Sequence, residues 1–143
     1  MLSNKFKIIA TDVDGTLLDD ESQIVPANKE ALLLAQKQGV HIALCSGRAY
    51  VTLAEFAKSL DLDPDNSHII AFNGGTVFDG RQNQIHQNTM DKAVFDFFAE
   101  QIMGFKMATI IYPQINTRLC YVPDESAREF FVRYFARANS ICG

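Results

Sequence analysis

The chain has 143 residues, of which 48% are hydrophobic and 21% are charged, and its formal net charge is -4. This composition is typical of one soluble globular domain, or of a compact unit with part of a second, and it excludes a disordered chain. The mild negative charge and the lack of a basic run give no support to binding of nucleic acid or of an anionic membrane. We expect neither a signal peptide nor a membrane span, which would need ~20 apolar residues.

The first half of the chain alternates buried apolar runs with amphipathic segments. We predict strands and helices in alternation at residues 7–12, 26–38, 40–45, 50–60 and 68–72. Pro26 is a typical first residue of a helix, and Gly39 is a typical residue after its end. Such alternation indicates an α/β fold with a parallel sheet and right-handed crossovers. Residues 76–78 and 84–86 are predicted to form a hairpin around Asp79-Gly80.

The most informative motif is Asp12-Val13-Asp14-Gly15-Thr16, which follows the first predicted strand. Two carboxylates at a strand end suit a hard cation such as Mg2+, and one of them could act as a nucleophile. The same residues are also an ordinary way to turn out of a strand. They resemble the opening of a calcium loop as well, but the third ligand and the closing Glu are out of register.

Two further polar motifs follow the next two predicted strands. Ser46-Gly47-Arg48 follows the second strand, and Asn73-Gly74-Gly75 follows the third. The carboxyl ends of parallel strands meet at one edge of a sheet, so these motifs should converge with Asp12 on one ligand site.

The residues of these two motifs could also have simpler, structural roles. Ser46 could bind phosphate or only cap the following helix. Arg48 could bind phosphate or form a surface ion pair, and Asn73 could contact substrate or only form a turn.

The pattern changes after residue 88. We predict helix, strand, strand and helix at residues 91–103, 107–112, 117–122 and 124–138, with the strands joined across 113–116. The predicted helices carry apolar stripes at helical spacing, which we interpret as core. The stripe residues are Val94, Phe98, Ile102, Ala127, Phe130, Phe131, Tyr134, Phe135 and Ala138.

The three cysteines, Cys45, Cys120 and Cys142, are odd in number and widely spaced. They form neither a Cys-x-x-Cys pair nor a metal-binding pattern. We therefore expect buried, reduced thiols in a cytoplasmic protein.

Taken together, the three strand-end motifs resemble those of the haloacid dehalogenase-like hydrolases, in particular the Cof-like sugar-phosphatase branch. The resemblance implies a Rossmann-like core over 1–88 and part of an αβ cap domain over 89–143. It implies that Asp12 is the nucleophile, that Asp14 is the general acid/base, and that both contribute to a Mg2+ site. It also implies phosphate or substrate binding by Gly15, Ser46, Gly47, Arg48 and Asn73.

The resemblance implies a Mg2+-dependent phosphomonoester hydrolase that acts on a small phosphorylated metabolite through an aspartyl-phosphate. The family's later lysine and acidic pair are not found here, so we expect an amino-terminal portion that ends within the cap. A phosphatase-like module that binds phosphate or a partner without turnover is the alternative. A phosphomutase or dehalogenase of the same superfamily is a third reading, and Asp14 argues against the dehalogenase. Association into a homo-oligomer through an exposed cap or sheet edge is a further expectation.

Overall fold

The computed structural model describes residues 6–115 and 117–140, with side chains described as far as Arg133. Contacts within the chain divide it into two compact units, Met1–Asn88 and Thr89–Gly143. This is the same division that the sequence pattern predicts, while the identities of the units as core and cap stay predictions. None of the described helices is long and apolar enough to cross a membrane.

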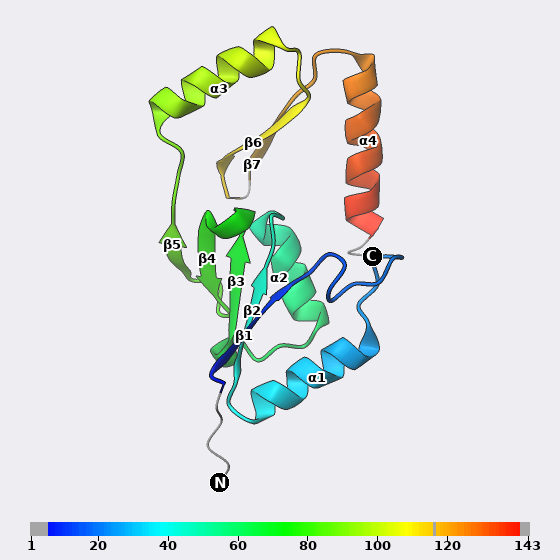
Figure 1. The fold of residues 1–143 in the computed structure, drawn as a ribbon, viewed down its shortest axis with the longest axis vertical. Helices are drawn as coiled ribbons and strands as arrows, with labels where there is room; N and C mark the ends of the chain where they lie inside the picture. The colour runs from blue at the N-terminus through cyan, green and yellow to red at the C-terminus, as the bar shows by residue number, and fades with distance from the viewer. Residues whose placement is uncertain (1–5, 116, 141–143) are drawn as a thin grey trace. The chain divides into compact units, whose positions relative to one another are not determined.

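The first unit is built on one five-stranded sheet with the strand order β1-β2-β3-β4-β5 (Figure 1). Its strands are β1 Ile8–Asp12, β2 His41–Cys45, β3 Ser67–Ala71, β4 Thr76–Asp79 and β5 Gln84–Gln87. The first three strands are parallel, and the β4–β5 hairpin continues the sheet in antiparallel fashion. The predicted α/β class with a Rossmann-like parallel core is confirmed.

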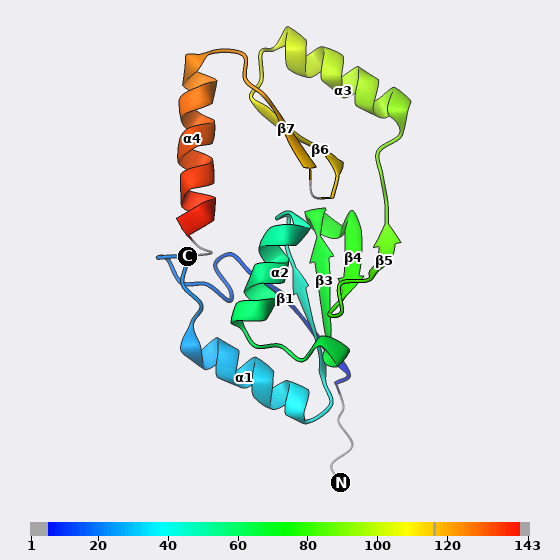
Figure 2. The same cartoon turned by 180° about the vertical axis from the view of Figure 1, so that it is seen from behind.

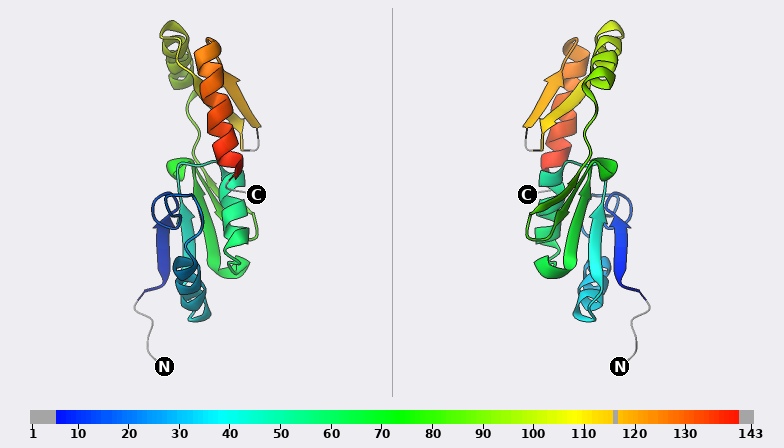
Figure 3. Two further views of the ribbon diagram at one scale, coloured as in Figure 1. Left: turned by 90° about the vertical axis from the view of Figure 1, so that its right-hand side faces the viewer. Right: turned by 90° about the vertical axis from the view of Figure 1, so that its left-hand side faces the viewer.

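Two helices cover one face of this sheet. They are α1, Pro26–Lys37, with Pro26 in its first turn, and α2, Tyr50–Ser59. Figure 2 shows α2 in front of the strands, and Figure 3 shows both helices on the same side of the sheet. The largest fully buried side chains of this unit are Ile42, Leu44, Leu53, Leu60 and Val13. Burial of each such side chain stabilises the fold by about 1.5–3 kcal/mol.

The connection between β1 and α1 is more ordered than its polar sequence suggests. Leu18 and Ile24 form an isolated antiparallel bridge. Leu17 and Leu18 are both buried, and the Asn28 side chain donates a hydrogen bond of 2.8 Å to the Thr16 carbonyl. Burial of the two leucines fixes the segment that follows the Asp12–Thr16 motif.

The second unit contains two helices and a two-stranded antiparallel sheet. Its elements are α3 Lys92–Gly104, β6 Thr109–Gln114, β7 Thr117–Tyr121 and α4 Glu125–Ser140. The predicted connection at 113–116 is too long, because Pro113 and Gln114 belong to β6. The register shifts between Ile111 and Gln114, and such an irregularity tolerates a proline that donates no ladder hydrogen bond.

Much of the apolar surface of the second unit is exposed, so the expectation of buried stripes is only partly met. In α3, which has no buried residue, Val94 and Phe98 are 43% and 48% exposed. On α4, Phe130 is 58% exposed, whereas Phe131 is 6% exposed and therefore well covered. Tyr134, Phe135 and Ala138 lie outside the described side chains.

The cysteine prediction is half right. Cys45 is a half-buried free thiol, but Cys120 is an exposed one. Cys120 lies on β7, in a sheet of only two strands, and nearly every residue of this strand is exposed. Cys142 lies outside the described residues.

Candidate active site

Asp12 is the last residue of β1 and stands at the carboxyl end of the parallel strands. It is exposed, and its carboxylate accepts no hydrogen bond from the residues that the structure describes. The register pairs Asp12 with Cys45 at the end of β2. Burial and the Asp12 charge both raise the pKa of the Cys45 thiol, so this thiol is a poor nucleophile.

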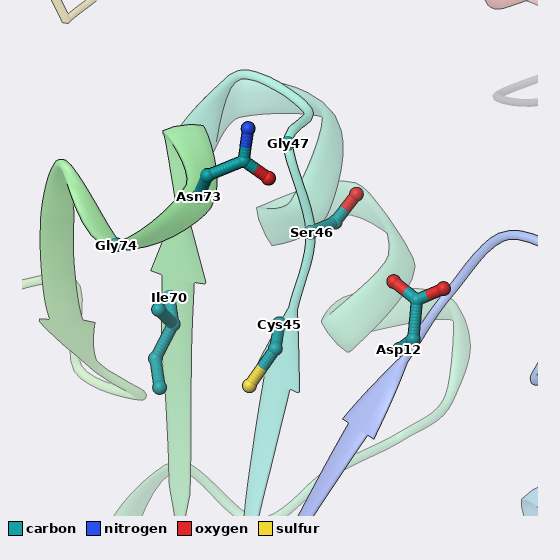
Figure 4. A pocket seen from close by; sticks show the side chains of 7 residues that line it. All are labelled: Asp12, Cys45, Ser46, Gly47, Ile70, Asn73 and Gly74. Carbon is teal, nitrogen blue, oxygen red and sulfur yellow. The ribbon is translucent and has the colours of Figure 1, made fainter.

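A pocket of about 300 Å³ opens at this edge of the sheet (Figure 4). Its lining residues come from the ends of three neighbouring strands and the turns after them: Asp12, Cys45, Ser46, Gly47, Ile70, Asn73 and Gly74. Figure 4 shows Asp12 and Ser46 at the tips of adjacent strands, with the Asn73 carboxamide beside Gly47. The predicted convergence of the three motifs on one pocket is therefore seen within the first unit.

The loop after β2 is held by its own polar groups. The Ser46 amide donates to the Ile70 carbonyl at 3.0 Å, and the Ser46 hydroxyl accepts from the Arg48 amide at 3.2 Å. The helix α2 begins after Ala49, which makes no side-chain capping bond. Ser46 is thus not the N-cap of α2, and its hydroxyl lines the pocket instead.

Arg48 forms a bidentate pair with Asp14. Its Nε and a terminal nitrogen donate to the two carboxylate oxygens at 2.9 and 2.6 Å. The guanidinium also lies over the Phe56 ring, 5.6 Å from its centroid. The hydrogen bonds from Arg48 hold the pKa of Asp14 below its ordinary value. While this pair persists, Asp14 stays ionised and neither of its oxygens can donate a proton.

The turn after β3 has an unusual backbone. Phe72, Asn73 and Gly74 have successive positive φ angles of 53°, 54° and 92°. Asn and Gly tolerate this left-handed region, but Phe does so at a cost. Two hydrogen bonds of 3.1 Å offset the strain, from the Phe72 amide to the Arg48 carbonyl and from the Asn73 amide to the Ser46 carbonyl. The turn is therefore tied directly to the Ser46–Arg48 loop.

The structure does not bring every predicted residue into the pocket. Asp14, Gly15 and Arg48 are not among its lining residues. Gly15 has a φ of 70°, so the turn itself favours glycine at this position. Sequence reasoning missed Cys45, Ile70 and Gly74 as lining residues. The strand register, which pairs Cys45 with Ile70, was the signal that could have found the first two.

The same residues offer few ligands for a metal ion. Among residues 6–115 and 117–140, no three His, Cys, Asp or Glu side chains come together as a metal-binding group. Asp12 and Asp14 offer two carboxylates at most, and Arg48 occupies the second. Mg2+ is commonly bound by one or two carboxylates together with water and substrate phosphate. The residues fit such a shared site and do not fit a site made of protein ligands alone.

Comparisons with known proteins show the family to which the chain belongs. The family model for haloacid dehalogenase-like hydrolases matches residues 9–139. The chain belongs to this family. Among curated relatives, the Bacillus subtilis 5-amino-6-(5-phospho-D-ribitylamino)uracil phosphatase YwtE is 36% identical over 107 residues, which cover 72% of this chain and 36% of that protein.

Solved structures of the family show the same fold. A haloacid dehalogenase-like hydrolase from Bacillus subtilis superposes with a TM-score of 0.75 at 22% identity, covering 96% of this chain and 48% of that one. One from Bacteroides thetaiotaomicron gives 0.67 at 27% identity, covering 76% and 41%. The chain spans less than half the length of the curated relatives it matches.

Proposed function

We propose that this protein is a phosphatase that hydrolyses a phosphomonoester through an aspartyl-phosphate on Asp12. The observation that carries the proposal is the position of Asp12. Its carboxylate accepts no hydrogen bond from the described residues and lies at a strand end, in a pocket that Ser46 and Asn73 also line. The family match over residues 9–139 supports the same chemistry.

The proposed reaction has two steps. In the first, an Asp12 oxygen attacks phosphorus, the ester P–O bond breaks, and Asp14 gives its proton to the leaving oxygen. In the second, water attacks phosphorus, Asp14 takes the proton, and phosphate leaves Asp12. The acid step requires that Arg48 first release at least one Asp14 oxygen and that this oxygen then take up a proton from solvent, because both oxygens accept from Arg48 in this structure.

The remaining predicted residues have binding roles in this scheme. The Ser46 hydroxyl and the backbone around Gly15 and Gly47 would donate hydrogen bonds to phosphate oxygens. Arg48, once released from Asp14, would add a positive charge. Mg2+ held by Asp12 and Asp14 would supply charge neutralisation between the carboxylates and the phosphate.

For the substrate we propose a small phosphorylated metabolite of the sugar or polyol type. The curated relative YwtE is named for a substrate with a phosphoribityl group, which supports this class. A cytoplasmic location would suit such a substrate, and the composition gives no reason to propose nucleic acid or a membrane as a partner.

The test is hydrolysis of para-nitrophenyl phosphate with Mg2+ by the full-length natural protein. Asp12→Asn should lower kcat by at least about 10³-fold, as loss of a nucleophile does, while leaving the circular dichroism spectrum unchanged. Beryllium fluoride with Mg2+ should bind the parent and not the variant. Asp20→Asn is the matched control, because Asp20 is an exposed aspartate that does not line the pocket. Equal activity of Asp12→Asn and the parent would refute the assignment.

A second candidate function is phosphate binding without turnover. The Arg48–Asp14 pair favours it, because the proposed acid is held ionised and engaged on both oxygens. This alternative predicts that phosphate or vanadate perturbs the Ser46 amide signal although no phosphate ester is hydrolysed with Mg2+.

A further inference from the structure

The Asn73 carboxamide lies against the loop after β2, beside Gly47 (Figure 4). A Cβ atom at Gly47 would lie 3.0 Å from Asn73 Oδ1 and 3.2 Å from its Nδ2. The carboxamide thus occupies the space that a side chain at Gly47 would need. Gly47 does not have a positive φ, so its backbone conformation does not require glycine, but a Cβ there would force the Asn73 carboxamide to shift by a few tenths of an ångström.

The backbone of Asn73 is fixed. Its φ is 54°, and its amide donates to the Ser46 carbonyl at 3.1 Å. These backbone constraints fix the point from which the Asn73 side chain leaves the main chain. Strain of this kind is commonly found where a structure fixes a group for function.

The carboxamide itself remains available to a ligand. Neither its oxygen nor its nitrogen forms a hydrogen bond with the residues that the structure describes. It lines the same pocket as Asp12 and Ser46. An uncharged amide offers a donor and an acceptor together. A hydroxyl group can satisfy both, whereas a phosphate dianion accepts hydrogen bonds and has no proton to give the amide oxygen.

We propose that Asn73 is a specificity-determining residue that binds a hydroxyl group of the substrate's leaving group, with the absence of a side chain at Gly47 leaving the space that its carboxamide occupies. The inference rests on the proposed phosphatase function, because it needs the phosphate of the ester to bind near Asp12 and Ser46. It adds to that function a reason for preferring polyol and sugar phosphates over phosphates of plain alcohols.

The test compares two esters of equal carbon number, glycerol 1-phosphate with two hydroxyls and propyl phosphate with none. Both are titrated into the 143-residue chain, with Mg2+ present, and followed by nitrogen–proton NMR. Both should shift the Ser46 backbone amide, but only glycerol 1-phosphate should shift the Asn73 side-chain amide. The hydroxyl ester should bind about threefold to tenfold more tightly, the range expected for one or two neutral hydrogen bonds.

Three variants complete the experiment. Asn73→Ala should abolish the preference between the two esters, and Asn88→Ala, the matched control outside the pocket, should keep it. Gly47→Ala should move the Asn73 side-chain signals already in the free protein. Equal responses of the Asn73 side chain to both esters, or a preference that survives Asn73→Ala, would overturn the inference alone. A Ser46 amide that responds to neither ester would overturn the proposed function and the inference with it.

Discussion

Replacing Gly80 by alanine should strongly destabilise the first unit. Gly80 follows β4 at the start of the hairpin, where the chain passes the short helical turn Pro64–Asn66. A Cβ atom at Gly80 would lie 2.5 Å from the Pro64 carbonyl oxygen and 2.8 Å from Pro64 Cα, and it would also overlap Ser67 Oγ. Two of these three obstacles are backbone atoms, which cannot rotate away.

The expected magnitude follows from these distances. The approach to the Pro64 oxygen is nearly an ångström shorter than an ordinary contact of 3.4 Å, so the hairpin and the turn must move apart. Overpacking of this kind costs about 1–3 kcal/mol, and we expect the upper end because backbone must shift. For a unit of this size, that corresponds to a decrease in melting temperature of about 10–20 °C.

The assay is native-state hydrogen exchange of the Ile42 and Leu44 amides, which report on the core of the first unit alone. Gly75→Ala is the matched control in the same unit, since Gly75 has no positive φ and a Cβ there would come no closer than 3.2 Å to any atom of a residue not adjacent in the chain. Adding Ser67→Ala to Gly80→Ala should recover only part of the loss, because the Pro64 backbone still obstructs. The reasoning would be refuted if Gly80→Ala lowered the free energy of unfolding by less than about 0.5 kcal/mol, the scale of an ordinary surface substitution. Full recovery of the parent's stability on adding Ser67→Ala would refute it as well.

Three further predictions concern charge, metal and association. Arg48 lowers the pKa of Asp14 in the folded state, so the pair stabilises the fold above the pKa of an ordinary aspartate and loses this effect as pH falls through the lowered value. Because the Asp14 side chain is 53% exposed, Arg48→Met should lower the free energy of unfolding by at most about 1 kcal/mol at pH 7. Urea unfolding should show a smaller decrease near pH 3, and a larger decrease at acid pH would contradict this reasoning. The two candidate carboxylates of the 143-residue chain supply too few ligands for tight Mg2+ binding. Calorimetric titration should therefore give a dissociation constant for Mg2+ in the millimolar range, and the chain should hydrolyse para-nitrophenyl phosphate slightly or not at all. Robust turnover would mean that other residues complete the site. Phe97 and Phe105 are 58% and 73% exposed, so the chain should self-associate or be only marginally stable. The variant Phe105→Asp should weaken the association measured by sedimentation. A monomer that resists dilution and unfolds in a sharp thermal transition would disprove the idea.

Some of the site was readable from the sequence because its residues occupy defined places in regular elements. The strands β1, β2 and β3 are short apolar runs bounded by polar and turn residues, so their ends were predicted to within about one residue, although β1, at the edge of the sheet, is mostly exposed rather than buried. Once those ends were known, the convergence of Asp12, Ser46 and Asn73 followed from the parallel arrangement alone. The exit from β1 was also local, because Gly15 supplies the positive φ that the turn requires.

Other features were decided only by tertiary structure. The sequence left Arg48 open between a phosphate ligand and an ion pair, and the fold pairs it with Asp14, 34 positions away. Likewise, the local sequence pattern did not predict that the Asn73 carboxamide lies beside Gly47 or that Cys120 is exposed. The physical reason is the same in each case. Periodicity reports which face of an element is apolar, whereas the contacts of one side chain depend on distant segments that only the packed chain brings within a few ångströms.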